Sequence, residues 1–393
     1  MIQFSEVEIV LPDSIVSRGT VVIDGNRIAE VTPRQLPPAP NATHLRLPGH
    51  YVVPGFIDVH VHGVDGKDSL DGGDVVRQIA RQLPKFGVTA FCPTSIACTP
   101  ALLRQMLDGI RAARERPDEA AARVLPAHLE SNFINPDFKG AQPLECLRVP
   151  AERSTEGDFT GDEILAEIAA ARGEVGIVTL APELDGAIDL IGTLVAHGHR
   201  VSLGHSGATY EEALAGIEAG ARHATHLFNR MTPLAHRAPG LAGAVLSNDD
   251  VAAEIVCDGV HVHPAVIRVA LAAKGAAKVM AITDGTAGSG RPRGSKALLG
   301  GRTITVGEVA FLDDLTIAGS VLTMDQAFRM LVRTAGVGIV EAARMCSTTP
   351  ARALNLQGFG AIIPGQLADL AVLGPDLRVT HTCIGGRLVH EST

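Results

Sequence analysis

The chain has 393 residues, and its 34 Lys and Arg against 43 Asp and Glu give a formal net charge of −9 with histidine neutral. Hydrophobic residues make up 46% and charged residues 20% of the chain, which is typical of a globular protein with a large core and excludes a disordered one. The acidic balance argues against nucleic acid as a partner, because a phosphate backbone requires a basic face.

The sequence also argues against a membrane partner and indicates a cytoplasmic protein. No run approaches the roughly 18 uncharged apolar residues of a membrane-spanning helix. Glu6 and Glu8 interrupt the apolar N-terminus, which therefore lacks the order of a signal peptide. The six cysteines form no CxxC pair and are typical of reduced core thiols: Cys92, Cys98, Cys146, Cys257, Cys346 and Cys383.

Both ends of the chain are rich in short predicted strands. The turn Asp24-Gly25-Asn26 between two β-rich runs is a hairpin signal. We predict one small β-sandwich domain built from residues 1–53 and 358–393. Its predicted strands are Val7–Leu11, Gly19–Ile23, Arg27–Val31, Ala368–Leu373, Val379–Ile384 and Arg387–Val389.

The middle of the chain, residues 54–357, alternates apolar runs with Ala-rich helical stretches. Thr209 with Glu212 is a capping-box signature at the start of one helix. Eight strand–helix units predict an α/β fold, a (β/α)8 TIM-like barrel whose chemistry lies at the C-terminal ends of the strands. The apolar runs are Val52–Val61, Val88–Phe91, Val124–Leu129, Val175–Leu180, Arg200–Leu203, His223–Thr225, Ala253–Val256 and Val279–Thr283.

Metal-ligand residue types follow several of these predicted strands. His60 and His62 lie on one face of the first strand, because side chains alternate along a strand. A histidine pair or a single carboxylate is, taken alone, often an ordinary structural feature. Several such residues at the ends of different barrel strands, however, converge at the mouth of the barrel, as a metal site requires. We predict a site for Zn²⁺, Fe²⁺ or Mn²⁺ there. Its residues are His60, His62, Glu130, His205 and His226, with Asp284 beside them.

Other histidines lie beside these positions without ending a strand in the same way. We expect them to pack around the ligands or to support them. They are His128, His197, His199 and His223.

The sequence around these residues resembles the N-acetylglucosamine-6-phosphate deacetylase family of the amidohydrolase superfamily. The resemblance runs nearly from end to end. It is carried by Pro54-Gly55-Phe56-Ile57-Asp58-Val59-His60-Val61-His62-Gly63, Val178-Thr179-Leu180-Ala181-Pro182-Glu183, Gly204-His205-Ser206, Ala224-Thr225-His226-Leu227-Phe228-Asn229, Pro239-Gly240-Leu241-Ala242-Gly243, Asp258-Gly259-Val260-His261-Val262 and Thr283-Asp284.

The resemblance implies a metal that Glu130, His205 and His226 hold. The presence of both His60 and His62 implies that a second ion, bridged through Glu130 or a hydroxide, can bind. We therefore expect one or two divalent ions per subunit, with Zn²⁺ ahead of Fe, Mn and Co.

The same resemblance assigns the residues around the ions. Asp284 matches the catalytic carboxylate of the family, and His261 matches a substrate ligand. Asn229 and Arg237 are implied to lie near the phosphate of the substrate. Arg237 is expected to come from the neighbouring subunit of a homodimer.

The chemistry of the residues agrees with this assignment. Hydrolysis of an amide at neutral pH needs an activated water, and a divalent ion lowers the pKa of water to about 7. A carboxylate such as Asp284 can take the proton of that water and return it to the departing amine. Arg230 and Arg237 make residues 229–237 a basic segment in an acidic chain, suited to a phosphate.

Two short segments depart from the family pattern. Ser131-Asn132-Phe133 stands where the family has Gly-Pro-Phe, and Gln142 follows Lys139-Gly140-Ala141 where the family has His. A glutamine can donate a hydrogen bond but cannot carry charge or relay a proton. We expect Gln142 to bind substrate, facing either the acetyl carbonyl or a hydroxyl of a differently arranged sugar.

Together these observations predict a metal-dependent hydrolase that converts N-acetylglucosamine 6-phosphate to glucosamine 6-phosphate and acetate. A deacetylase of a different N-acetylated amino sugar is the first alternative. A cyclic amidase or deaminase is disfavoured because the predicted fourth strand, Glu174–Leu180, has no lysine to carry a bridging carboxylate. A non-catalytic scaffold is disfavoured because the chain retains all six ionisable candidates.

Overall fold

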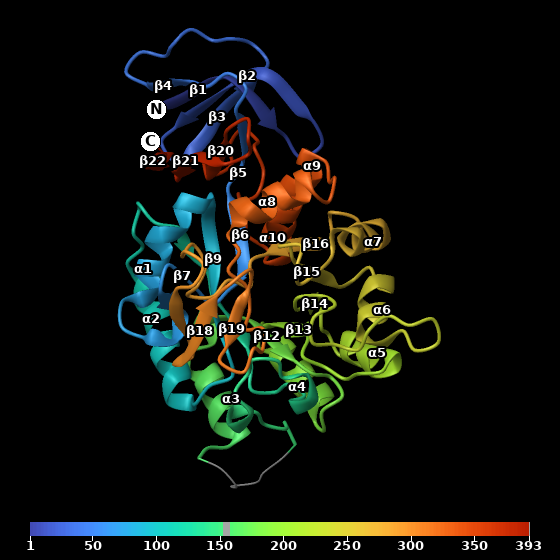
Figure 1. Ribbon diagram of the computed structural model, residues 1–393. Coiled ribbons are helices and arrows are strands. Elements are labelled where there is room, and N and C mark those ends of the chain that lie inside the picture. The colour runs from blue at the N-terminus through green and yellow to red at the C-terminus, as the bar shows by residue number, and fades with distance from the viewer. Residues whose placement is uncertain (152–157, 393) are drawn as a thin grey trace.

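The computed structural model describes residues 1–151 and 158–392. An α/β barrel and a separate β-domain make up these residues, and both chain termini lie at the β-domain (Figure 1). The predicted fold class is therefore confirmed. Among these residues, none of the helices combines the length and the apolar composition that a bilayer span requires.

The β-domain is built from the two ends of the chain. Strand β5 pairs with β1 in parallel and with β20 in antiparallel orientation, so one sheet joins both ends. Phe4, Ile9 and Ile23 are fully buried in its apolar core. The strands are β1 (Ile2–Val10), β2 (Ile15–Asp24), β3 (Arg27–Thr32), β4 (Thr43–Arg46), β5 (Tyr51–Pro54), β20 (Leu370–Leu373), β21 (Val379–Ile384) and β22 (Arg387–Glu391).

The predicted hairpin joins β2 and β3. Gly25 adopts a φ of +56°, a conformation that glycine reaches without a steric penalty. We retain the proposed domain boundaries near residues 54 and 358, because β5 belongs to the β-domain sheet and β6 to the barrel.

The barrel strands coincide with the predicted apolar runs. Within the described chain, eight parallel strands follow one another in sequence order from β6 to β16. A bridge between Val61 and Gly285 joins the first strand to the segment after the last. The strands are β6 (Phe56–Val61), β9 (Val88–Ser95), β11 (Ala127–Glu130), β12 (Val175–Leu180), β13 (Arg200–Leu203), β14 (His223–Ala224), β15 (Ala252–Val256) and β16 (Val279–Ile282), with the short β10 (Arg123–Val124) beside β9.

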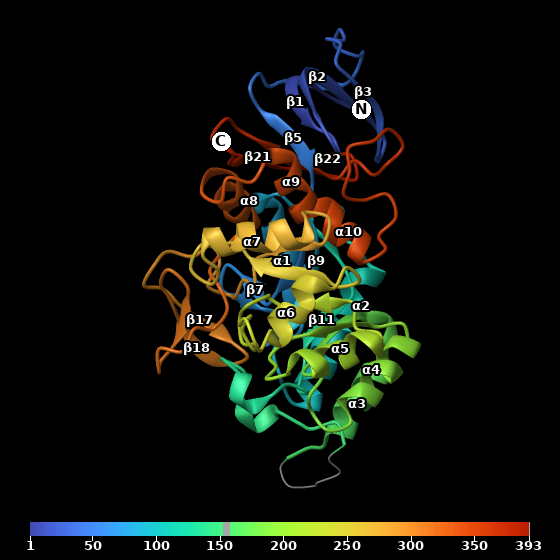
Figure 2. The ribbon, with the colours of Figure 1, turned by 90° about the vertical axis from the view of Figure 1, so that its right-hand side faces the viewer.

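Helices surround the barrel on the outside (Figure 2). The capping box at Thr209 is confirmed, since its hydroxyl accepts from the Glu212 N–H at 3.2 Å and Glu212 accepts from the Thr209 N–H at 2.8 Å. The helices are α1 (Val75–Gln82), α2 (Pro100–Glu115), α3 (Gly161–Ala170), α4 (Ala187–Ala196), α5 (Tyr210–Glu218), α6 (Gly240–Ser247), α7 (Pro264–Lys274), α8 (Met324–Arg333), α9 (Ile339–Ala343) and α10 (Thr349–Ala353).

Shorter helical segments complete these connections. They are the 3₁₀ turns η1 (Ser69–Asp71), η2 (Leu83–Phe86), η3 (Pro136–Phe138), η4 (Leu144–Cys146) and η5 (Arg172–Glu174), and the π-helical η6 (Arg344–Thr348).

A small antiparallel sheet that the sequence patterns did not predict lies between β16 and α8. It consists of β17 (Lys296–Leu299), β18 (Arg302–Val306) and β19 (Ala310–Leu312), and we call it the insert sheet. In Figure 2 it lies beside β7 (Gly63–Val64), which pairs with β8 (Lys67–Asp68). Gly300 N–H donates to Asp68 at 2.7 Å, which ties the insert sheet to the segment after β6.

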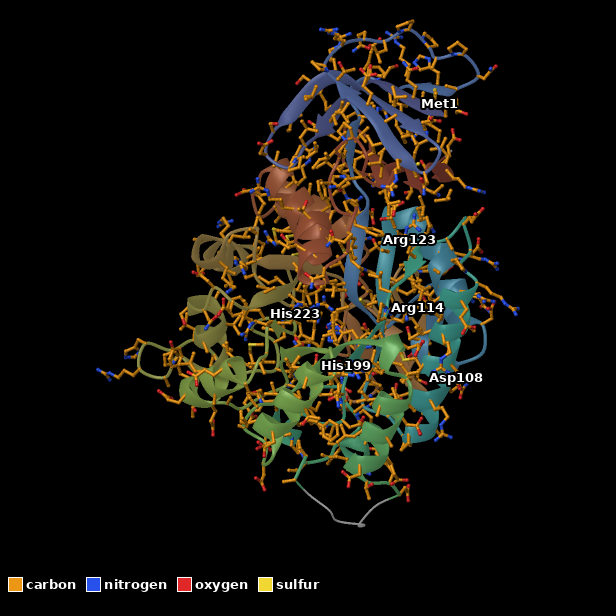
Figure 3. The ribbon with its side chains drawn as sticks, turned by 180° about the vertical axis from the view of Figure 1, so that it is seen from behind. Met1, Asp108, Arg114, Arg123, His199 and His223 are labelled. Atoms are coloured by element: carbon orange, nitrogen blue, oxygen red, sulfur yellow. The ribbon has the colours of Figure 1, made fainter. Side chains whose placement is uncertain are left out.

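The β-domain and the barrel are joined by an ion pair in which Asp369 is buried and Arg123 is half-buried. Arg123 donates to both carboxylate oxygens of Asp369, at 2.8 and 3.1 Å, and lies between the two parts in Figure 3. A planar guanidinium that binds a carboxylate with two hydrogen bonds fixes orientation as well as distance. All six cysteines are buried and free, as their scattered spacing predicted.

Candidate active site

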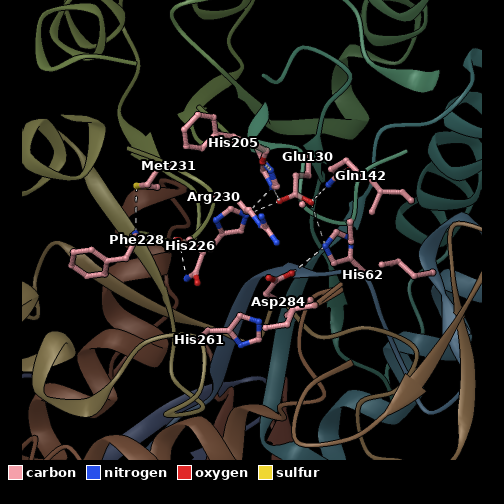
Figure 4. Close-up of a pocket in the computed structure, with 18 of the residues that line it drawn as sticks. His62, Glu130, Gln142, His205, His226, Phe228, Arg230, Met231, His261 and Asp284 are labelled. Carbon is pink, nitrogen blue, oxygen red and sulfur yellow. Dashed lines mark hydrogen bonds and ion pairs between the residues drawn. The ribbon is translucent and has the colours of Figure 1, made fainter. Parts of the chain in front are cut away.

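Three ligand-type side chains converge at the C-terminal ends of three barrel strands. Glu130 ends β11, and His205 and His226 each follow the end of their strand by two residues. Glu130 Oε1 lies 2.8 Å from His205 Nε2 and 2.9 Å from His226 Nε2, and the two nitrogens are 3.0 Å apart. Figure 4 shows the three side chains pointing toward one another.

The backbone aims both histidines into the barrel. His205 has a φ of +48° and His226 a φ of +30°, in the left-handed region that non-glycine residues seldom adopt. Glu183 holds the turn after His205, because its carboxylate accepts from the Ser206 hydroxyl and from the Gly207 N–H. Strain of this kind persists where the surrounding structure fixes it, and it clusters at functional sites.

The hydrogen bonds of His205 test whether this group fits a metal ion. Its Nδ1 lies 2.8 Å from the Phe138 carbonyl, which can only accept, so Nδ1 carries the hydrogen and Nε2 is left as an acceptor. That lone pair faces the oxygen of Glu130 and the nitrogen of His226. Acceptors this close repel unless a proton or a cation lies between them. A divalent ion with nitrogen and oxygen ligands satisfies all three atoms, so the residues fit.

Electrostatics at the site also favours a positive charge. Burial disfavours the charged form of His226, but the hydrogen bond and charge of Glu130 outweigh it and raise the pKa to about 9. Burial would raise the pKa of Glu130, yet the neighbouring His205 and His226 hold it well below its ordinary value. The carboxylate is therefore ionised, and the site attracts a proton or a metal ion.

His60 and His62 form a second group on the other side of Glu130. Both are buried, and their Nε2 atoms are 3.3 Å apart. His62 Nε2 lies 3.7 Å from Glu130 Oε2, the oxygen that does not face His205. The alternation along β6 therefore brings both rings to one face, and they join Glu130 as a second ligand-type group.

Glu254 on β15 lies behind this second group, and the sequence patterns did not identify it. It is fully buried, and its Oε2 accepts from His60 Nδ1 at 3.0 Å. The bond leaves His60 Nε2 free to face the site, as outer carboxylates do for metal-binding histidines. A glutamate within the otherwise apolar run Ala252–Val256 was the signal that could have revealed it.

Asp284 follows β16 and faces both histidines of the second group. Its Oδ1 lies 3.2 Å from His62 Nε2 and 3.4 Å from His60 Nε2. Burial would raise its pKa, but His60 and His62 lower it below the ordinary value. Asp284 is thus an ionised carboxylate whose oxygen can accept a proton at the floor of the pocket (Figure 4).

A cavity of about 440 Å³ opens above these residues. His261 lines it, and its Nδ1 lies 2.5 Å from Asp258 Oδ2, so its Nε2 is left for a ligand. Asn229 and Arg230 line it as well. The cavity is therefore lined by buried ionisable side chains at its floor and by polar side chains nearer its opening.

Arg230 lines the same cavity, and its charge has no partner among the residues that the structure describes. It is exposed, with a φ of +49°, and its side chain packs against Gly140. Within residues 1–151 and 158–392, its guanidinium makes no hydrogen bond or ion pair. An unpaired guanidinium on the wall of a cavity is suited to an anionic ligand group.

Arg237 does not join the cavity of its own chain. It is exposed in the connection between β14 and α6, which projects from the barrel in Figure 1, and it is absent from the residues lining the cavity. The expected contribution of Arg237 to the neighbouring subunit stays a prediction.

The residues that depart from the family pattern all face protein partners. The Ser131 hydroxyl donates to the Thr179 carbonyl at 2.6 Å, and Asn132 donates to the carbonyls of Cys98 and Cys146. Gln142 lines the cavity, but its amide contacts Ala97 and Glu130. The structure thus assigns Ser131 and Asn132 to the surrounding core, away from the cavity.

Of the four histidines expected to pack around or support the ligands, three are buried, and the expectation is wrong for His197, which is exposed. His128 Nδ1 donates to the Val59 carbonyl at 3.0 Å, and its Nε2 lies 2.7 Å from the Thr179 hydroxyl. His199 bonds to the Val175 carbonyl and His223 is fully enclosed, whereas His197 is exposed at the end of α4. His199 and His223 are labelled in Figure 3.

Comparison with known proteins gives a consistent picture. The model of the Amidohydrolase family matches residues 51–389. The chain is 32% identical to N-acetylglucosamine-6-phosphate deacetylase of Bacillus subtilis, over 98% of this chain and 96% of that protein. It is 34% identical to N-acetylgalactosamine-6-phosphate deacetylase of Escherichia coli O157:H7, over 92% of this chain and 93% of that protein.

Solved structures of similar proteins cover the whole chain. N-acetylglucosamine-6-phosphate deacetylase from Pasteurella multocida superposes with a TM-score of 0.90 at 27% identity, covering 100% of both chains. A mutant of the Mycobacterium smegmatis enzyme, in complex with N-acetyl-D-glucosamine-6-phosphate, superposes with a TM-score of 0.88 at 32% identity, covering 99% of both chains.

Proposed function

The chain belongs to the Amidohydrolase family, and on that basis we propose that it removes the acetyl group from an N-acetylated amino sugar 6-phosphate. The observation that carries the proposal is the cavity itself. Its floor holds Glu130, His205 and His226 next to the ionised Asp284, and its wall carries the unpaired Arg230. The relatives named as deacetylases of N-acetylglucosamine 6-phosphate and N-acetylgalactosamine 6-phosphate support this substrate class.

Glu130, His205 and His226 would hold a divalent ion, and Zn²⁺ suits their nitrogen and oxygen atoms. Such an ion would lower the pKa of a water molecule to about 7 and would polarise the carbonyl oxygen of the amide. His60 and His62 would hold a second ion, at a position that an oxygen of Glu130 and Asp284 Oδ1 also face.

Asp284 is the group that would move the proton. Its ionised oxygen faces the same space as the ligand-type groups, so it can take a proton from the attacking water. As the bond between the carbonyl carbon and nitrogen breaks, the same carboxyl returns the proton to the departing amine. The products are acetate and the free amino sugar. His261 Nε2, held by Asp258, would orient the substrate beside Asp284.

Arg230 and Asn229 would bind the phosphate from the same chain as the catalytic residues. Arg237 would add a second cation from the neighbouring subunit of a homodimer, because its exposed connection points away from its own cavity. Two guanidinium groups suit a dianionic phosphate better than either alone, since each offers a forked pair of donors.

Acetate release tests the proposed function. The full chain, loaded with Zn²⁺, is incubated with the gluco- and galacto-configured N-acetylated sugars, each with and without the 6-phosphate. We expect release from at least one phosphorylated sugar and much less from the unphosphorylated pair. Release of acetate from none of the four sugars would refute the proposal.

A further inference from the structure

Gln142 lies between two partners that fix the orientation of its amide. The Ala97 N–H donates to Gln142 Oε1 at 2.7 Å, and Gln142 Nε2 donates to Glu130 Oε2. Because a backbone N–H can only donate, the oxygen of the amide must face Ala97 and the NH₂ group must face Glu130. The side chain is almost fully buried, although it lines the cavity.

The loop that carries Gln142 is held from two sides. The Gln142 N–H donates to the Lys139 carbonyl at 3.0 Å, which closes a turn before it. Arg302 of the insert sheet donates to the Ala141 carbonyl from outside the barrel. The amide therefore reaches Glu130 from a fixed backbone.

This contact makes the two oxygens of Glu130 unequal. Oε1 faces His205 and His226 within 3.0 Å, whereas Oε2 accepts from Gln142 and lies 3.7 Å from His62 Nε2. His60 Nε2 lies 3.9 Å from Oε1. An ion held by both His60 and His62 would therefore compete for Oε1, which already faces His205 and His226, or for Oε2, which already accepts the amide hydrogen of Gln142. Rotating the carboxylate toward that ion would leave the buried amide hydrogen without an acceptor.

We propose that Gln142 is a positioning residue that commits Glu130 to the ion at His205 and His226 and weakens the ion at His60 and His62. This role of Gln142 rests on the metal-dependent function proposed above, but it affects the binding of ions and not the rate of turnover. The protein then binds one ion tightly and a second at least about tenfold more weakly, the lower end of the effect that outer-shell partners exert on metal affinity.

The test is a titration of the metal-free full chain with Zn²⁺, followed by calorimetry and by elemental analysis of equivalents bound. Gln142→Leu keeps the size of the side chain and removes the amide. We expect the second ion to bind about 10- to 100-fold more tightly in this variant, while the first ion changes by less. Gln142→Met, which is unbranched and also lacks a donor, repeats the test if the leucine variant folds poorly.

Two control variants distinguish an effect of the Gln142 amide on Glu130 from an effect of a less rigid loop or a less stable protein. Gln105→Leu makes the same change at an exposed position on α2, and we expect it to alter neither ion affinity. Arg302→Ala releases the loop from the insert sheet but leaves the amide in place. If Arg302→Ala changed the ratio of the two affinities as much as Gln142→Leu does, loop rigidity rather than the amide would be responsible, and the proposal would be wrong.

The outcomes of the titration also distinguish this role from the proposed function. A wild-type chain that binds no ion, or two ions with equal affinity, overturns the role of Gln142. Unchanged affinities in both Gln142 variants overturn it as well. A wild-type chain that binds ions as expected but releases no acetate would refute the proposed function and leave the role of Gln142 standing.

Discussion

The floor and the wall of the cavity are built in different ways. On the floor, His60, Glu130 and His226 are almost fully buried, and each contacts another ionisable group within 3.4 Å. On the wall, Arg230 is exposed and has no protein partner within the described chain. The floor comes from strand ends that the barrel positions rigidly, whereas the wall comes from loops. The difference indicates that the floor is organised for chemistry before substrate arrives, and that the wall is completed by an anionic ligand.

The largest expected effect on metal binding and turnover comes from a substitution of Glu130, which lies at the centre of the cavity floor. Glu130→Gln removes the charge that His205 and His226 share, so we expect loss of most of the tight ion and a fall in kcat on the order of 10³-fold. Elemental analysis and acetate release measure the two effects. Glu145→Gln, an exposed change, is the control. Full metal content with wild-type turnover in Glu130→Gln would contradict the assignment.

Asp284→Asn should reduce turnover without releasing the tightly bound ion, although Asp284 lies on the same cavity floor as the metal ligands. The amide keeps the shape of the carboxyl but cannot accept the proton, so kcat should fall on the order of 10²-fold while the tight ion stays bound. Asp137→Asn changes another cavity residue without touching the floor and should retain turnover within a few-fold. Turnover of Asp284→Asn close to wild type would mean that another group moves the proton.

The wall should respond in KM rather than in kcat. Arg230→Ala removes the unpaired guanidinium, so KM for a phosphorylated sugar should rise about tenfold or more, while KM for the unphosphorylated sugar changes little. Arg293→Ala removes an exposed arginine paired with Glu308 and serves as the matched control. An equal rise for both sugars would remove phosphate binding from the role of Arg230.

Arg237 tests whether the wall extends across two subunits. We expect Arg237→Ala to raise KM for the phosphorylated sugar by a few-fold. Mixing this variant with Asp284→Asn provides a sharper measurement, because a mixed dimer would contain one site with both an intact Asp284 and a partner's intact arginine. Recovery of the wild-type KM in the mixture supports a contribution in trans, and activity no greater than the sum of the separate variants contradicts it.

The smallest effect concerns the barrel beneath both regions. Burial lowers the pKa of His223 to about 3, and the unfolded chain has the ordinary value of about 6.5. Below pH 6.5 the unfolded state therefore binds a proton that the folded state does not, and the free energy of unfolding falls as pH decreases toward 3. This contribution is fully present above pH 6.5.

A variant at this position should remove that part of the pH dependence. Between pH 7.5 and 5.5, His223→Gln should reduce the loss of unfolding free energy by about 1.4 kcal/mol relative to wild type. Denaturant unfolding at the two pH values measures the change. His236→Gln alters an exposed histidine and should leave the pH dependence as it is. The same slope in wild type and His223→Gln would show that His223 is protonated equally in both states.

The sequence by itself determined the barrel and the residues on its floor. The strands that were expected are present, including β14, which is only two residues long. His60 and His62 share a face because side chains alternate along any strand, and Glu130, His205, His226 and Asp284 converge because parallel strands end at the same edge of a barrel. These facts depend on local periodicity and on chain order, which are both visible in the sequence.

The tertiary structure alone decided which partner each polar group has. Three hydrogen bonds join residues that are far apart in the sequence: from Gly300 of the insert sheet to Asp68, from His60 to Glu254 and from Ala97 to Gln142. The sequence predicted only that Gln142 binds substrate; it lines the cavity, and the structure adds that its amide contacts Glu130 and Ala97. Hydrogen-bond partners depend on the packing of loops from different strands, and neither strand periodicity nor residue type specifies that packing.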